Sequence, residues 1–156
     1  MEARLNFFEN PIAPKLIKYV NSAGQVVTES SLPRTTQELV KIRASQINGC
    51  GYCLDMHTKD AAAAGENQQR LNLVGAWRDA TVFTEAEKAA LEVAEEGTRL
   101  ADSGGVSDDV WARAAKHYDE EQLGSLVAII ALINFYNRLN VLAQLPAGDY
   151  EPGQWE

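Results

Sequence analysis

The sequence contains little cysteine, no excess of positive charge and no long apolar segment. Only 2 of its 156 residues are cysteines, too few for the disulfide framework of a small secreted protein. Its 14 Lys and Arg residues are outnumbered by 22 Asp and Glu residues, which gives a formal charge of −8. Such an acidic balance argues against binding to nucleic acid or to an anionic membrane surface.

The N-terminus also has no basic start followed by an apolar run of signal-peptide length. The longest apolar run, from Leu126 to Ile133, is far shorter than the roughly 20 residues of a membrane-spanning helix. We therefore expect a cytoplasmic protein without a membrane anchor, in which this run belongs to a core or subunit-interface helix.

Alternation typical of β-strands is scarce, and helical periodicity dominates the sequence. Breakers and capping residues delimit predicted helices at about Ala13–Ser22, Thr35–Ile47, Cys50–Ala64, Asn67–Trp77, Thr84–Ala101, Ser107–His117 and Asp119–Leu142. Residues 25–33 are predicted to form a loop, and the tail from Pro146 is predicted to be irregular and mobile. No linker separates domains, so we expect a single all-α domain of six to seven helices over residues 1–156.

Two of the helix starts have a strong local signature. Thr84 is followed three residues later by Glu87, the pattern of a capping box, and Asp119 with Gln122 resembles another helix start. Each pair predicts a helix that begins at the following residue.

Both cysteines lie in one short segment, Cys50-Gly51-Tyr52-Cys53, with His57 four residues further on. On a helix, the spacing of Cys50, Cys53 and His57 places all three side chains on one face. The helix N-terminus and a neighbouring imidazole both favour a thiolate. A thiolate can attack peroxide or a disulfide, and a second cysteine can then condense with the sulfenic acid.

Other interpretations of the two cysteines remain open at this point. They could bind zinc with His57 and His117, or they could be two inert core thiols. A thioredoxin-like redox loop is disfavoured because that fold requires a strand before the motif, whereas here a helix is predicted.

The segment from Glu38 to His57 resembles the alkylhydroperoxidase D-like (AhpD-like) branch of the carboxymuconolactone decarboxylase superfamily. The family pattern has a Glu twelve positions before the first Cys of a CxxC motif, then three residues and a His, and this sequence matches it throughout. Looser similarity, including the pairs Trp77-Arg78 and Asn137-Arg138, extends the resemblance over about residues 35–142.

The resemblance implies an all-α homo-oligomer with the dithiol near a subunit interface. It implies a thiol-dependent peroxidase, or a relay adaptor for another peroxidase, that needs a peroxide substrate, a dithiol or lipoyl-type reductant and no bound cofactor. In that scheme Glu38 orients His57, His57 activates Cys53 for attack on peroxide, and Cys50 forms the disulfide. The helix terminus alone would favour Cys50 as the more reactive sulfur.

One position departs from the family pattern. Better-studied members have a histidine between the two cysteines as part of the proton relay, whereas this sequence has Tyr52. A tyrosine hydroxyl, with an ordinary pKa of about 10, is a poor base near neutrality. We expect a relay shortened to Glu38 and His57, with Tyr52 in a supporting role and slower peroxide turnover.

The remaining noteworthy side chains are expected to be structural. Trp77 and Trp111 are predicted to be core or interface anchors, and His117 is predicted to lie in the last turn of a helix. Arg138 is expected to pair with an acid or a carbonyl group, because an unpaired buried charge is costly.

Overall fold

The computed structural model describes residues 2–155, which form an all-α fold, as predicted. Within this range there are eight α-helices, two short 3-10 helices and no β-strand. In chain order these are η1 (Phe7–Glu9), α1 (Ala13–Thr28), α2 (Arg34–Asn48), α3 (Gly51–Ala63), α4 (Gln68–Leu73), η2 (Val74–Asp79), α5 (Glu85–Thr98), α6 (Leu100–Ser103), α7 (Asp108–Ala114) and α8 (Glu120–Ala143). The prediction counts α5 and α6 as one helix.

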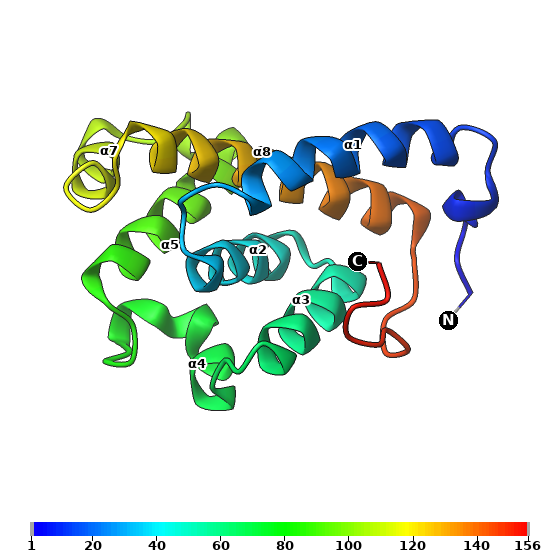
Figure 1. The fold of residues 1–156 in the computed structure, drawn as a ribbon, viewed down its shortest axis with the longest axis horizontal. Helices are drawn as coiled ribbons and strands as arrows, with labels where there is room; N and C mark the ends of the chain where they lie inside the picture. Colours follow the sequence, from blue (N-terminus) through cyan, green and yellow to red (C-terminus); the bar gives the residue numbers. More distant parts are fainter. Residues whose placement is uncertain (1, 156) are drawn as a thin grey trace.

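Helix α2 lies at the centre of the fold, while α1 and α8 run side by side along one edge (Figure 1). Different faces of α2 contribute to three apolar clusters. Val40 packs with residues of α5 and α8, and Ile42 packs with residues of α4, η2 and α5. Ala44 packs with Cys50, Cys53 and Ile133. The cysteines are therefore part of the core between α2, α3 and α8.

Helix α1 is longer than predicted, because it continues to Thr28 rather than ending near Ser22. Val27 is buried in the core beside α5 and α8. Burial of this side chain outweighs the weak helix propensity of Gly24 and the β-branched residues that follow it. The prediction of a loop over residues 25–33 is correct only after Glu29, which caps the helix.

The predicted capping box is present, and the second predicted helix start also has one. The Thr84 hydroxyl accepts a hydrogen bond from the Glu87 backbone N–H, and the Glu87 carboxylate accepts one from the Thr84 N–H. Asp119 and Gln122 make the equivalent pair at the start of α8. Each box satisfies two N–H groups that the first helical turn leaves without a partner.

Other helix boundaries differ from the prediction where the backbone leaves helical geometry. The predicted helix over residues 67–77 is divided into α4, which ends at Leu73, and the 3-10 helix η2, inside which Ala76 has the non-helical angles φ −120° and ψ 31°. Arg99 separates α5 from α6. Helix α7 ends at Ala114, so His117 lies beyond the helix rather than in its last turn, and it is exposed.

Among the described residues, α8 is the one helix that is long and apolar enough to cross a membrane by length and composition. In this fold it packs on α1, α2, α3 and α5. Leu126, Ile129 and Ile133 are buried in the protein core, and the helix also buries Asn134, Asn137 and Asn140. This burial identifies it as the core helix that the sequence predicts.

The C-terminal tail is irregular, as predicted, but it is bound to α3. The Asp55 carboxylate accepts hydrogen bonds from the backbone N–H groups of Gly148 and Tyr150, at 2.7 and 3.2 Å. The Tyr150 hydroxyl donates to Asp60 at 2.9 Å, and Lys59 donates to the Tyr150 carbonyl at 2.8 Å. These contacts return the end of the chain to the helix that carries the cysteines (Figure 1).

Candidate active site

A sharp turn between α2 and α3 positions the two cysteines. Gly49 ends α2 in the left-handed region, with φ 65°, a conformation that favours glycine. Cys50 then adopts extended geometry as the N-cap of α3, and its backbone N–H donates to the Ser45 carbonyl at 3.0 Å. Cys50 is therefore the capping residue itself, one position before the first turn in which the sequence places it.

The two cysteines form a disulfide, with an S–S distance of 2.00 Å. The Cys50 sulfur also accepts a hydrogen bond from the Cys53 backbone N–H at 3.2 Å. Both residues are almost fully buried, with 1% and 0% of their surface exposed. The structure thus represents the oxidised state of a dithiol that is shielded from bulk water.

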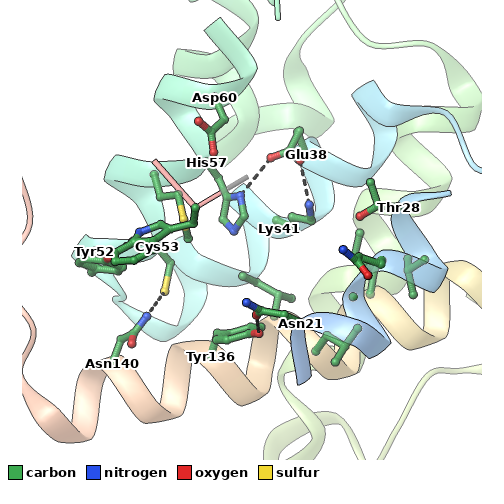
Figure 2. Close-up of a pocket in the computed structure, with 18 of the residues that line it drawn as sticks. Asn21, Thr28, Glu38, Lys41, Tyr52, Cys53, His57, Asp60, Tyr136 and Asn140 are labelled. Atoms are coloured by element: carbon green, nitrogen blue, oxygen red, sulfur yellow. Dashed lines mark hydrogen bonds and ion pairs between the residues drawn. The ribbon is translucent and has the colours of Figure 1, made fainter. Parts of the chain in front are cut away.

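Glu38 and His57 are joined by a hydrogen bond between α2 and α3. The distance from His57 Nδ1 to Glu38 Oε2 is 3.0 Å. The other carboxylate oxygen, Oε1, accepts a hydrogen bond from Lys41 Nζ at 2.8 Å, and Arg34 Nε lies 3.6 Å from it. Figure 2 shows the Glu38 carboxylate between the imidazole and the ammonium group. This arrangement fixes the imidazole by one nitrogen and leaves the other available for proton transfer.

The carboxylate of Glu38 is held in its ionised form. Burial alone would raise its pKa, but the hydrogen bond from His57 and the charge of Lys41 outweigh burial and lower the pKa to about 2. The carboxylate therefore stays charged near neutrality and keeps its hydrogen bonds to His57 and Lys41.

The site opens into a pocket of about 690 Å³ between α1, α2, α3 and α8. Cys53, His57 and Glu38 line it, whereas Cys50 is not among its lining residues. Most of the remaining wall is apolar, and its apolar side chains include Ile17, Val27, Met56, Ile129, Leu132, Ile133 and Leu139. Of the two cysteines, Cys53 is therefore the one that borders the pocket.

Tyr52 also lines this pocket, beside Phe8 and Trp155. Its hydroxyl accepts a hydrogen bond from Trp155 Nε1 at 3.1 Å, and the Trp155 ring stacks on Phe8. Burial raises the pKa of Tyr52, the Trp155 hydrogen bond opposes this increase, and the charge of Asp55 adds to it. The phenol is therefore protonated near neutrality and is not a base there.

Two residues at the site were missed by the sequence analysis. Asn140 Nδ2 donates a hydrogen bond to Cys53 Sγ at 3.4 Å (Figure 2). No local spacing connects these residues, since they lie 87 positions apart. Lys41 could have been found, because it lies three residues after Glu38 on the same helix.

The other side chains considered from the sequence lie outside the pocket. Trp77 is buried and donates to Glu95 at 3.0 Å, which confirms its role as a core anchor. Trp111 is 40% exposed. Arg138 donates to the carbonyl of Asn134 within its own helix at 3.1 Å, so its expected carbonyl partner is local.

The described residues contain no preformed set of ligands for the zinc ion considered from the sequence. Within residues 2–155, no group of three or more His, Cys, Asp and Glu side chains is arranged to hold a metal ion.

The sequence profile of the carboxymuconolactone decarboxylase family matches residues 14–96, more than half of the chain. The chain belongs to this family. Within the carboxymuconolactone decarboxylase family it falls in the AhpD-like branch, as the motif from Glu38 to His57 predicts. The two cysteines, His57 and Glu38 all lie within the matched range.

Several proteins are similar to this chain in sequence or in fold. The chain is 44% identical to the uncharacterized protein YdfG of Bacillus subtilis over 141 residues, which are 90% of this chain and 94% of YdfG. A crystal structure from Agrobacterium tumefaciens is also similar, that of a protein of unknown function named as a candidate antioxidant defence protein AhpD. The two chains are 32% identical with a TM-score of 0.89, and the alignment covers 96% of this chain and all of the other. A more distant structure, the debrominase Bmp8, has 22% identity and a TM-score of 0.77 over 87% of this chain and 73% of its own, and shows the fold alone.

Proposed function

We propose that this protein is a thiol-dependent peroxidase that reduces hydrogen peroxide or organic hydroperoxides through a Cys50–Cys53 dithiol and disulfide cycle. The observation that carries the proposal is the position of Cys53 and the Glu38–His57 pair on the wall of one pocket. The AhpD-like relatives support a peroxide-related role.

The chemistry divides between the two cysteines and His57. His57 takes the proton of the Cys53 thiol, and the thiolate attacks one oxygen of the peroxide. The S–O bond forms as the O–O bond breaks, and the departing oxygen takes the proton from the imidazolium. The Cys50 thiol then attacks the Cys53 sulfenic acid, which releases water and forms the disulfide.

A separate thiol donor completes the cycle. A dithiol or lipoyl-type reductant transfers two electrons to the disulfide and is itself oxidised, so no bound cofactor is needed. We further propose that residues 1–156 act as one domain in a cytoplasmic homo-oligomer.

A relay adaptor for another peroxidase is the second candidate. The disulfide between Cys50 and Cys53 suits either role. The two functions differ in the oxidant, because an adaptor receives its oxidising equivalents from a partner disulfide rather than from peroxide.

Titration of the reduced protein with one equivalent of peroxide distinguishes these functions. A peroxidase loses both free thiols and its intact mass falls by two hydrogens. Unchanged thiols after peroxide, combined with rapid oxidation by a small disulfide, would identify the adaptor and exclude the peroxidase.

The role of His57 has a matched control in the second histidine. We expect His57→Ala to slow peroxide-driven disulfide formation by about 10² or more, as loss of a general base does. His117→Ala changes an exposed histidine outside the pocket and should leave the rate unchanged. Equal rates for the two variants would remove His57 from the mechanism.

A further inference from the structure

Helix α8 buries three asparagines, Asn134, Asn137 and Asn140, toward its C-terminal end. Their spacing of three residues places them along one side of the helix. A buried amide group costs free energy unless it is hydrogen-bonded. The partner of each amide therefore indicates why the position is polar.

The first two asparagines fasten α8 to α2 and α5. Asn48 Nδ2, at the end of α2, donates to the Oδ1 atoms of Asn134 and Asn137, both at 2.9 Å. Asn137 Nδ2 donates to Ser45 Oγ at 3.0 Å, and Asn134 Nδ2 donates to Thr98 Oγ1 at 3.1 Å. These bonds fix the position of α8 along the turn that carries the cysteines.

Asn140 has a different kind of partner. Its amide donates to Cys53 Sγ at 3.4 Å, and no other side-chain hydrogen bond of Asn140 is formed within residues 2–155. Asn140 is 5% exposed, and it lines the same pocket as Cys53. The Cys50 sulfur instead accepts from a backbone N–H. Of the two sulfurs, only that of Cys53, which borders the pocket, accepts a hydrogen bond from a side chain of another helix.

We propose that Asn140 is a catalytic residue that stabilises the thiolate of Cys53 and so makes this sulfur the one that attacks the substrate. This inference rests on the proposed dithiol chemistry. An N–H donor strengthens its hydrogen bond when the acceptor becomes an anion, so the amide favours the thiolate over the thiol. Asn140 transfers no proton or electron; His57 carries the proton and the peroxide accepts the electrons.

Alkylation of a single thiol by iodoacetamide over a range of pH values tests the inference. Cys50→Ser leaves Cys53 as the only thiol, and serine retains an oxygen that can cap α3. In this background Asn140→Leu removes the donor, and Asn140→Asp replaces it with a carboxylate of similar shape. We expect each change to raise the pKa of Cys53 by about one unit, which slows alkylation about tenfold at a pH below both values.

Two controls separate this effect from a general disturbance of the helix. Leu142→Asp adds a charge at a position of α8 that is 71% exposed, and should leave the pKa of Cys53 unchanged. In a Cys53→Ser background, Asn140→Leu should leave the pKa of Cys50 unchanged. Folded Asn140 variants with the parental Cys53 pKa, or an equal shift at Cys50, would overturn the inference.

The alkylation experiment contains no peroxide, so its outcome is independent of the proposed function. A raised Cys53 pKa in the Asn140 variants supports the role of the amide even if peroxide fails to oxidise the parent dithiol. That second failure would overturn only the peroxidase assignment.

Discussion

Glu38 is the residue on which the geometry of the site depends most. It is buried at 6% exposure, yet it contacts His57, Lys41 and Arg34. The folded protein lowers the pKa of Glu38 to about 2, from the value of 4.5 for an unperturbed glutamate. The ionised carboxylate therefore contributes stability that is fully present above about pH 4.5 and is lost as the pH falls through about 2.

Glu38→Gln tests this contribution directly, because glutamine keeps the shape of the side chain but does not ionise. We expect the variant to have a free energy of unfolding lower by roughly 3 kcal/mol at pH 7, from the shift of the Glu38 pKa from 4.5 to about 2. The difference from the parent should narrow as the pH falls from about 4.5 toward 2. Urea denaturation at several pH values measures it.

Glu85→Gln is the matched control, since the Glu85 side chain is 77% exposed and pairs only at the surface with Lys88. It should change the free energy of unfolding by less than about 0.5 kcal/mol. If Glu38→Gln lowers the free energy of unfolding by the same amount at pH 7 and at pH 3, the charge of Glu38 is not the cause of the loss.

At the scale of the elements, α3 connects the site to the C-terminal tail. Cys53 and His57 lie on the same helix as Asp55, Lys59 and Asp60, which bind the tail. Beyond those contacts, Trp155 reaches Tyr52 in the wall of the pocket. The tail is thus a part of the wall of the site rather than a free end.

Asp55→Ala should release the segment that Asp55 holds. We expect amide hydrogen exchange at Gly148 and Tyr150 to accelerate about tenfold or more, because each N–H loses a hydrogen bond to a charged acceptor. Asp149→Ala, within the same segment but exposed, should leave both rates unchanged. Equal acceleration in the two variants would mean that Asp55 does not anchor the tail.

The sequence predicts the parts of the site that lie close together along the chain. The placement of Cys53 and His57 one turn apart on a helix follows from local rules, whereas Cys50 lies before that helix as its N-cap. The Glu38 contact follows from the family resemblance. The contacts of Asn140 and Tyr150 could not be predicted, because they join residues about 90 positions apart. The extension of α1 was missed for the same reason, since burial of Val27 against other helices decides it.

At the scale of the whole molecule, Glu95 joins three elements: its own helix α5, helix α2 and the 3-10 helix η2. Its buried carboxylate accepts hydrogen bonds from Arg43 of α2 and from Trp77 and Arg78 of η2. Burial would raise the pKa of Glu95, but the hydrogen bonds from Arg78, Trp77 and Arg43 outweigh burial and lower it. This carboxylate fixes α2, and with it Glu38, relative to α5.

Glu95→Ala should lower the free energy of unfolding by about 3 kcal/mol or more, because it leaves the partly buried Arg43 without its carboxylate and the buried indole N–H of Trp77 without its acceptor. Glu92→Ala, on the same helix, removes a carboxylate that pairs with the exposed Arg113, and should cost less than about 1 kcal/mol. Thermal or urea denaturation compares them. Similar losses in the two variants would contradict a central role for Glu95.

Trapping of a sulfenic acid in single-cysteine variants shows whether peroxide oxidises this dithiol and which sulfur it oxidises. Reduced Cys50→Ser and Cys53→Ser proteins are treated with one equivalent of hydrogen peroxide in the presence of dimedone, and the adduct is located by mass spectrometry. The account predicts rapid modification of Cys53 in the Cys50→Ser protein and little modification of Cys50 in the Cys53→Ser protein. An adduct that forms faster on Cys50, or no adduct on either sulfur, would contradict it.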